Sequence, residues 1–199
     1  MLANAEEAGR NTEPMRYFQL MDDVNVPGGW ILGTPTDERT GRPLSGVFLA
    51  GHPLPVSGPV RVPFLQPGRA LDFSLANTAP VVHTKVASVL AELAPADVQL
   101  IPANVETHPE QYCLLNVLRI VKCIDDAACE EVNYWTPEDG VPEKTGRYFS
   151  VYGLRIAPTR VGGARIFRPW GWEIALIVSE SIKEAMQRLG VTGARFEEV

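Results

Sequence analysis

Apolar residues recur along the chain at two different spacings, and each spacing predicts a different element. Helical spacing is found over residues 80–93, in Val82, Val86, Val89, Leu90 and Leu93. This pattern predicts an amphipathic helix that packs on one face and meets water on the other. Asn77 or Thr78 is placed to cap this helix, and Pro80 suits its first turn.

A second helix is predicted near the C-terminus. Its apolar stripe consists of Ile182, Ala185, Met186 and Leu189. Ser179 or Ser181 is a suitable N-cap, and Ser181 with Glu184 has the spacing of a capping box. Gly190 stands where a left-handed C-terminal residue is wanted. We therefore expect a helix over about residues 180–189, followed by an edge strand that turns Phe196 inward.

Shorter apolar runs, separated by glycine and proline, predict strands. They lie at residues 17–21, 30–32, 98–105 and 112–124, with three more between 46 and 75. A helix is disfavoured in these parts because a proline in a helix interior costs about 3 kcal/mol. The run at 112–124 is the longest, so we expect it to be a central strand. Between "LRIA" and "ARIF", Gly162–Gly163 predicts a hairpin turn.

Together these elements predict an α+β fold with a mostly antiparallel sheet and two principal helices. The pattern leaves open a division into two closely packed subdomains that meet near residue 100. We expect residues 1–14 to be a flexible N-terminal leader, because small, polar and charged types alternate there without an apolar face. Residues 15–199 are then expected to form a single domain.

Composition narrows the function classes. Hydrophobic residues make up 45% of the 199 residues, enough for a sizeable core. The formal net charge of -6 argues against a nucleic-acid partner, because such proteins need a basic footprint. The sequence shows neither a secretory signal nor an apolar run long enough to cross a bilayer, so we expect a cytoplasmic chain without a membrane partner. The cysteines, Cys113, Cys123 and Cys129, form no CxxC pair and indicate neither a disulfide framework nor a zinc site.

Motifs for catalysis are missing from the sequence. His52, His83 and His108 are dispersed, and the chain has no GxSxG nucleophile elbow or GxGxxG phosphate loop. We therefore predict no catalytic residues, no cofactor and no metal. One alternative is an enzyme whose site assembles from scattered residues such as His83, Asp72 and Glu106. Another is a binding module of a secretion or signalling assembly.

The most acidic part of the chain is a segment predicted to be a loop. The sequence from Asp125 to Lys144 contains seven carboxylates and a single lysine, Lys144. Such a loop is either solvated surface, a patch that steers a basic partner, or a metal or catalytic site. It also holds two aromatic residues, and exposed aromatic anchors ringed by charge are typical of interface hot spots. The predicted partner-binding residues are Asp125, Asp126, Glu130, Glu131, Tyr134, Trp135, Glu138 and Asp139.

Two further sets of residues have open roles. Five arginines either neutralise the acidic loop within the fold or meet acidic groups of another protein: Arg147, Arg155, Arg160, Arg165 and Arg168. Trp170 and Trp172 are two residues apart, so on a strand they would face the same side. They would form either an aromatic platform or an anchor in the core.

The order of these landmarks resembles a known family. The landmarks are "YFQL", "GWILGTP", "GHPLP", "LDFSL", "PVVHTKVASVL", "VQLIPANV", "YCLLNVLRIVKCID" and "LIVSESIKEAMQRLGVTGARFEEV". In this order they resemble the immunity-protein domain of bacterial polymorphic toxin systems, whose named representatives come from myxobacteria and which was long catalogued as a domain of unknown function. The most specific pieces are Asp125, after its strand, and the unit from Ser179 to Phe196.

The resemblance covers roughly residues 15–199 and consists of structural landmarks without a catalytic signature. It implies a small cytoplasmic protein, encoded beside a toxin, that protects its producer by binding that toxin. Such an inhibitor needs a stable scaffold and a complementary surface, with no reactive group. The C-terminal unit is then scaffold, and the function is expected on exposed loops.

Overall fold

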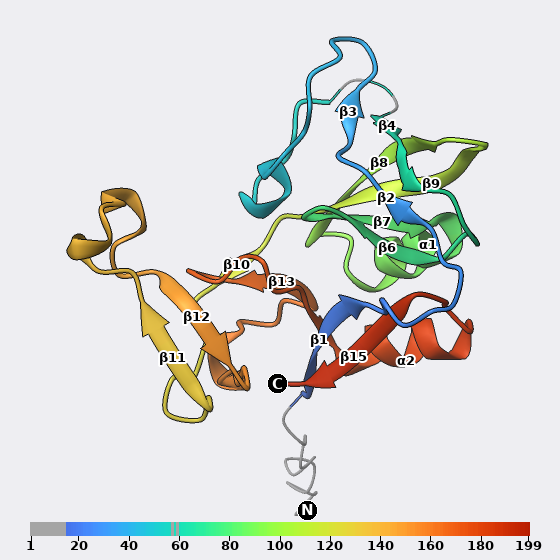
Figure 1. Ribbon diagram of the computed structural model, residues 1–199. Helices are drawn as coiled ribbons and strands as arrows, with labels where there is room; N and C mark the ends of the chain where they lie inside the picture. The colour runs from blue at the N-terminus through green and yellow to red at the C-terminus, as the bar shows by residue number, and fades with distance from the viewer. Residues whose placement is uncertain (1–14, 57, 59) are drawn as a thin grey trace, which may run out of the picture.

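The described residues form two larger β-sheets, a short two-stranded pair, two α-helices and a projecting hairpin (Figure 1). The computed structural model describes residues 15–56, 58 and 60–199; the predicted leader at residues 1–14 lies outside them. The predicted α+β class is confirmed, and most strand pairs are antiparallel. The chain passes from one sheet to the other at Leu118–Arg119, directly after the longest strand.

The larger sheet has six strands in the order β3-β4-β8-β9-β7-β6. Its strands are β3 (Thr36–Asp37), β4 (Val60–Val62), β8 (Val98–Val105), β9 (His108–Val117), β7 (Ala79–His83) and β6 (Phe73–Ala76). The pair β4–β8 is parallel and the other pairs are antiparallel. The predicted long central strand is confirmed as β9, although it ends at Val117. A short separate pair, β2 (Ile31–Leu32) and β5 (Phe64–Gln66), lies beside this sheet, where β2 contacts β6.

The second sheet has five strands in the order β10-β13-β14-β1-β15. They are β10 (Ile120–Val121), β13 (Ile166–Pro169), β14 (Ile177–Ser179), β1 (Tyr17–Asp22) and β15 (Ala194–Glu198). The pair β10–β13 is parallel and the rest are antiparallel. The predicted edge strand at the C-terminus is confirmed as β15, whose Phe196 packs against the core.

The predicted hairpin between "LRIA" and "ARIF" is wrong. Ile156 instead forms a bridge with Ile124, and β13 pairs with β10 and β14. A 3-10 turn at Pro158–Arg160 intervenes, and Gly162–Gly163 form a turn that leads the chain away. The two segments diverge because Val161 and Ala164, on either side of that turn, are buried in the core under the second sheet.

The first predicted helix begins later than its apolar spacing suggested. Helix α1 covers Thr84–Leu93, and the preceding residues form β7 between β6 and β9. Val81 and Val82 are both fully buried, so the chain here is covered on two sides as a strand. The predicted caps are also wrong: Asn77 lies in the β6–β7 turn, and the N-cap is His83, whose Nδ1 accepts from the Lys85 N–H at 3.2 Å.

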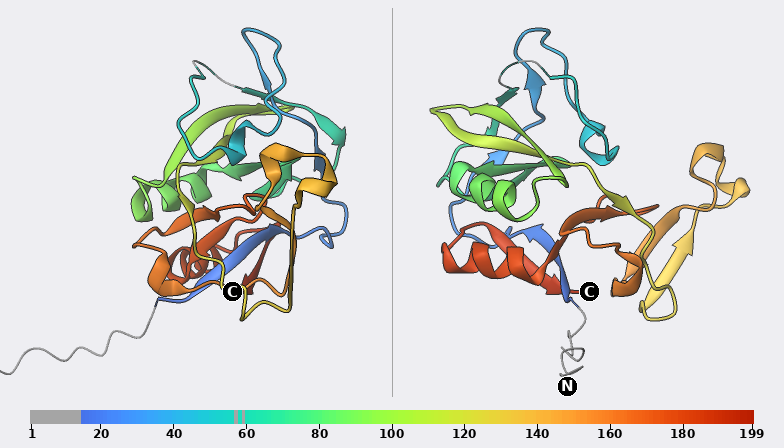
Figure 2. Two further views of the ribbon diagram at one scale, coloured as in Figure 1. Left: turned by 90° about the vertical axis from the view of Figure 1, so that its left-hand side faces the viewer. Right: turned by 180° about the vertical axis from the view of Figure 1, so that it is seen from behind.

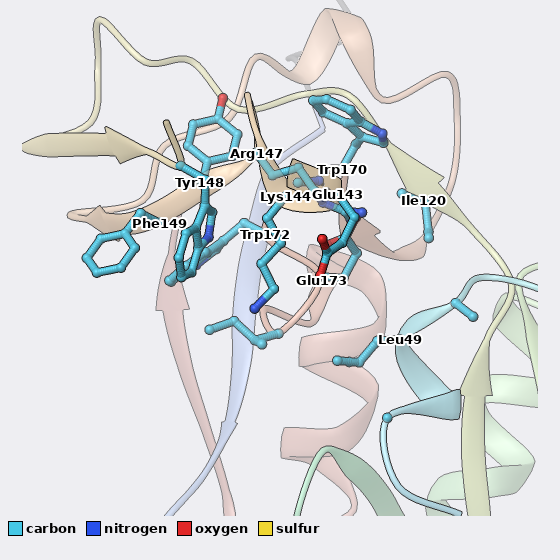
Figure 3. Close-up of a pocket in the computed structure, with 15 residues that line it drawn as sticks. Leu49, Ile120, Glu143, Lys144, Arg147, Tyr148, Phe149, Trp170, Trp172 and Glu173 are labelled. Atoms are coloured by element: carbon cyan, nitrogen blue, oxygen red, sulfur yellow. Dashed lines mark hydrogen bonds and ion pairs between the residues drawn. The ribbon is translucent and has the colours of Figure 1, made fainter. Parts of the chain in front are cut away.

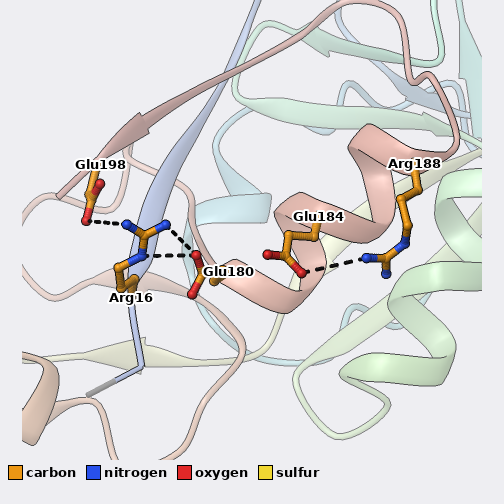
Figure 4. Close-up of polar contacts among 5 residues, drawn as sticks. All are labelled: Arg16, Glu180, Glu184, Arg188 and Glu198. Atoms are coloured by element: carbon orange, nitrogen blue, oxygen red, sulfur yellow. Dashed lines mark hydrogen bonds and ion pairs between the residues drawn. The ribbon is translucent and has the colours of Figure 1, made fainter. Parts of the chain in front are cut away.

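The second helix agrees with its prediction to within a residue. Helix α2 covers Glu180–Arg188, and its N-cap is Ser179; the capping box from Ser181 is not formed. At the other end Gly190 has φ +60°, its N–H donates to Gln187 O, and the Val191 N–H donates to Met186 O. These two bonds form a Schellman motif. Figure 4 shows the ion pairs that α2 adds at both ends.

One core cluster joins the two halves of the molecule. α1 packs on the six-stranded sheet, α2 packs on the five-stranded sheet, and the helices contact each other (Figure 2). The cluster between them includes Phe18, Leu90, Leu115, Ile166 and Met186. A second cluster fills the other side of the six-stranded sheet, and a third lies where the projecting hairpin meets the body.

Candidate functional site

The acidic segment is a hairpin that stands off the body, and we call residues 125–155 the arm. Strand β11 (Glu131–Tyr134) pairs antiparallel with β12 (Tyr148–Tyr152), and Figures 1 and 2 show both projecting from the second sheet. Two 3-10 turns, Pro137–Asp139 and Pro142–Lys144, form its tip. The prediction of a simple loop is therefore wrong in this part, because its residues find β partners across the hairpin.

Three of the predicted partner-binding carboxylates make contacts within the arm. Asp126 accepts hydrogen bonds from the hydroxyls of Tyr134 and Tyr148, the second at 2.6 Å. Asp139 Oδ2 accepts from the Thr136 N–H at 2.7 Å and so caps the turn at the tip. Glu131 accepts from Asn133 Nδ2 at 2.7 Å. These side chains shape the arm as well as giving it charge.

The other predicted residues differ in exposure. Glu130 and Glu138 are exposed, and among the described residues neither forms an ion pair. Asp125 is half-buried at the root of the arm, where its N–H donates to Arg155 O. Tyr134 is 41% exposed and Trp135 is half-buried. The structure thus brings all eight predicted residues onto one arm.

Two pairs of aromatic rings hold the strands of the arm together. Tyr134 and Tyr148 have ring centroids 4.9 Å apart, and Trp135 and Phe149 have centroids 4.8 Å apart in an edge-on contact. The pairing register shifts between Asn133 and Tyr134, so the two ring pairs lie beside a bulge in the hairpin. Burial and the hydrogen bond to Asp126 raise the pKa of Tyr148 well above its usual value.

A large hollow of about 830 Å³ lies where one face of the arm meets the body (Figure 3). We call it the aromatic hollow. The arm contributes Trp135, Tyr148 and Phe149 to its lining, and the body contributes Leu49, Ile120, Trp170, Trp172 and Ile174. Trp170 is 40% exposed, Phe149 is 54% exposed and Ile174 is 58% exposed. Of these, the sequence singled out Trp135, Trp170 and Trp172 alone.

The turn that carries Trp170 and Trp172 is fixed from two sides. Glu173 Oε1 accepts from the Gly171 N–H at 2.9 Å and pairs with Arg147 at the start of β12. Behind it, Arg168 is 2% exposed, and its guanidinium donates to Glu173 O at 2.8 Å and to Thr78 O at 3.4 Å. Burial lowers the pKa of Arg168 to about 10.

Most of the five arginines brace the fold. Arg155 donates to Glu198 O and so ties the arm's root to β15 of the second sheet, and Arg160 donates to Ile124 O, just before the arm. Within the described residues, no ion pair joins these arginines to the carboxylates between Asp125 and Glu143. The tryptophans instead meet cations: Lys144 lies 4.7 Å from the Trp135 centroid and Lys122 lies 5.1 Å from that of Trp170.

A smaller, polar hollow of about 470 Å³ adjoins the aromatic hollow at the base of the arm. Asp125 and Asp126 line it together with Lys122 and Arg160, so both signs of charge are present. Tyr148 and Trp170 border both hollows. The two hollows therefore share a wall of aromatic rings at the base of the arm.

Of the residues of the alternative enzyme site, Asp72 and His83 are neighbours, because the His83 N–H donates to Asp72 O at 2.8 Å. Asp72 is bound by Thr192 and Lys85, His83 caps α1, and Glu106 pairs with Arg61. None of them lines the two hollows beside the arm. In the described part of the chain, no three His, Cys, Asp or Glu side chains are grouped to hold a metal ion. No helix among the described residues has the length and apolar character needed to span a bilayer.

The fold and the arm define an α+β protein whose aromatic side chains lie among carboxylates on a projecting hairpin. Exposed tyrosine and tryptophan in such surroundings are typical of protein-binding sites.

Comparison with known proteins gives the family. The model of the Immunity protein family (Imm11) matches residues 1–199, so the chain belongs to this immunity protein family. The resemblance inferred from the sequence is thereby confirmed. A search of curated proteins gave no match.

Proposed function

We propose that this chain is a cytoplasmic immunity protein that binds and neutralises a cognate bacterial toxin without catalysis, as part of a polymorphic toxin system. Membership of an immunity protein family is the observation that carries this proposal. The projecting arm supports it, because an inhibitor of this kind acts through a surface. An interface of ordinary size buries about 800 Å² on each partner, and we expect the arm and the hollow beside it to supply it.

The predicted partner-binding residues have two roles in this proposal. Tyr134 and Trp135 are the aromatic anchors that contact the toxin, since partly exposed aromatic rings supply much of the energy of an interface. Glu130 and Glu138 are exposed and attract a basic toxin surface. The remaining carboxylates, Asp125, Asp126, Glu131 and Asp139, add negative charge and keep the arm in shape.

Co-expression with the product of the adjacent gene tests this function. We expect the chain to restore growth of a bacterial host that expresses this toxin, and to co-purify with it. Titration of purified toxin activity should reach full inhibition at a fixed molar ratio. The toxin should regain activity, with unchanged mass, once the complex is dissociated.

Two results would contradict the proposal. Failure of the chain to bind the neighbouring toxin or to protect the host would remove the immunity function. Protection by a small fraction of a molar equivalent, with a chemically altered toxin or product, would favour the enzyme alternative.

A further inference from the structure

The aromatic hollow is a surface that the predicted partner-binding residues cover only at Trp135. Its rim exposes Phe149, Trp170 and Ile174, which come from β12 and from the chain on both sides of Gly171. Contiguous exposed apolar side chains on a soluble protein mark interaction surfaces, whereas scattered ones need no explanation. All three residues line one hollow, of which Figure 3 labels Phe149 and Trp170, so they form a contiguous apolar surface.

Polar contacts hold the hollow in shape before anything binds. The Glu173 carboxylate joins Arg147 of the arm to the Gly171 N–H of the body. The buried Arg168 guanidinium holds the same turn from behind through Glu173 O. Rings fixed in this way lose little conformational entropy on binding, and this preorganisation favours their use as a docking surface.

Charge around the hollow indicates what fits into it. In its wall, Arg147 is paired with Glu173, and Lys144 lies over the Trp135 ring. At the arm tip, the exposed Glu138 and Glu143 form no ion pair within the described residues. Glu143 itself lines the hollow, so the aromatic lining carries two carboxylates and two cations, and Glu138 and Asp139 add negative charge at the arm tip. The complementary surface carries an uncharged apolar group with cations beside it.

We propose that the aromatic hollow receives an apolar or aromatic side chain of the toxin, flanked by lysine or arginine residues that face the carboxylates of the arm tip. This inference rests on the proposed function and extends the interface from the arm to the body. Trp170 and Phe149 contact the inserted side chain, and Ile174 packs against its base. Glu173 and Arg168 act as positioning residues.

Binding of the purified toxin encoded by the adjacent gene tests the inference by calorimetry. Trp170→Ala and Ile174→Asp should each raise Kd about tenfold or more, the effect expected of anchors at the centre of an interface. Leu65→Asp is the matched control, because Leu65 is 74% exposed on β5 and lies outside the hollow. It should leave Kd unchanged. Thermal unfolding of all three variants should stay near that of the wild type, since each replaced side chain is exposed.

The outcomes separate this inference from the proposed function. If the wild type binds and both hollow variants keep its Kd, while Trp135→Ala weakens binding, the toxin contacts the arm alone and the inference is overturned. If the wild type does not bind the toxin, both proposals fail. Native mass spectrometry that shows a small molecule held by the wild type and lost from Trp170→Ala would identify a ligand site and overturn the inference. A dimer that Ile174→Asp dissociates would overturn it in favour of a second copy.

Discussion

Side chains of one chemical type take different roles on the arm. Asp126 is bound by two tyrosine hydroxyls, whereas Glu138 has no ion pair among the described residues. The Asp126 carboxylate forms hydrogen bonds within the arm, so replacing Asp126 disturbs the arm itself. Replacing Glu138 changes surface charge alone. The contacts of a carboxylate, which the sequence does not show, therefore decide how a mutation of it is interpreted.

Arg168 gives a prediction about single residues. Arg168→Ala should lower the free energy of unfolding by about 3 kcal/mol, because it leaves a cavity and removes the donors to the part-buried carbonyls of Glu173 and Thr78. Arg165→Ala is the control, since Arg165 is exposed, and it should change the free energy by less than about 0.5 kcal/mol. Urea unfolding measures both values. Equal stability of the two variants would mean that Arg168 does not hold the Trp170 turn.

At the scale of elements, a turn or helix end can be predicted from the sequence when residues close together in the chain determine it. The Schellman motif after α2 depends on Gly190, and the arm tip depends on the Thr136–Asp139 capping box. Elements that need a distant partner behave differently. The helical apolar spacing predicted over residues 80–93 includes Val82, yet Ala79–His83 form β7 because β6 and β9 flank them. Pairing across the sheet outweighs local propensity there.

Two glycines in the turn after α2 provide a comparison at this scale. Gly190→Ala should lower the free energy of unfolding by about 1 kcal/mol, because a residue with a side chain is strained at its φ of +60°. No further loss is expected, since nothing lies within 4 Å of the added Cβ. Gly193→Ala should cost clearly more. Its φ is +81°, and the added Cβ would lie 2.3 Å from Phe73 O, a backbone atom that cannot move aside. Thermal unfolding compares the two, and equal midpoints would contradict this reasoning.

At the scale of the whole molecule, a few polar contacts supplement the shared core in joining the halves. Asp72, before β6, accepts hydrogen bonds from Thr192 N–H and Oγ1, each at 2.8 Å, and pairs with Lys85 of α1 at 2.9 Å. Thr192 lies in the turn between α2 and β15. One carboxylate therefore ties the first sheet, its helix and the second half together.

This contact predicts a dependence of stability on pH. Burial raises the pKa of Asp72, but the bonds from Lys85 and Thr192 outweigh it and hold the pKa below the ordinary 3.8. A carboxyl whose pKa is depressed in the folded state stabilises the fold above its unfolded pKa and loses this effect in stronger acid. Asp72→Asn should therefore lower the free energy of unfolding by about 1 kcal/mol at pH near 7. The difference from the wild type should shrink below pH 3.8, as urea titrations at several pH values would show.

Long-range charge gives a prediction about association. The acidic arm should speed capture of a basic toxin surface, so Glu138→Lys with Glu143→Lys should lower the association rate about tenfold at low salt. The dissociation rate should change little, and the difference from the wild type should fade as salt is added. Stopped-flow fluorescence measures these rates. An association rate independent of salt in the wild type would exclude steering by the arm.

The sequence by itself determined the α+β class, helix α2 with its glycine stop, the central and edge strands, and the family. Each of these depends on neighbours in the chain or on the order of landmarks. It also placed the eight predicted partner-binding residues in one segment, although their role stays a prediction.

Only the tertiary structure decided where α1 begins, that residues 154–167 form no hairpin, and that the acidic segment forms a projecting hairpin. It also brought Leu49, Ile120, Phe149 and Ile174 to one hollow with the tryptophans. The physical reason is common to all of these features. Strand pairing and concave surfaces arise from contacts between residues far apart in the chain, and apolar periodicity records that a residue is buried without recording which partner buries it.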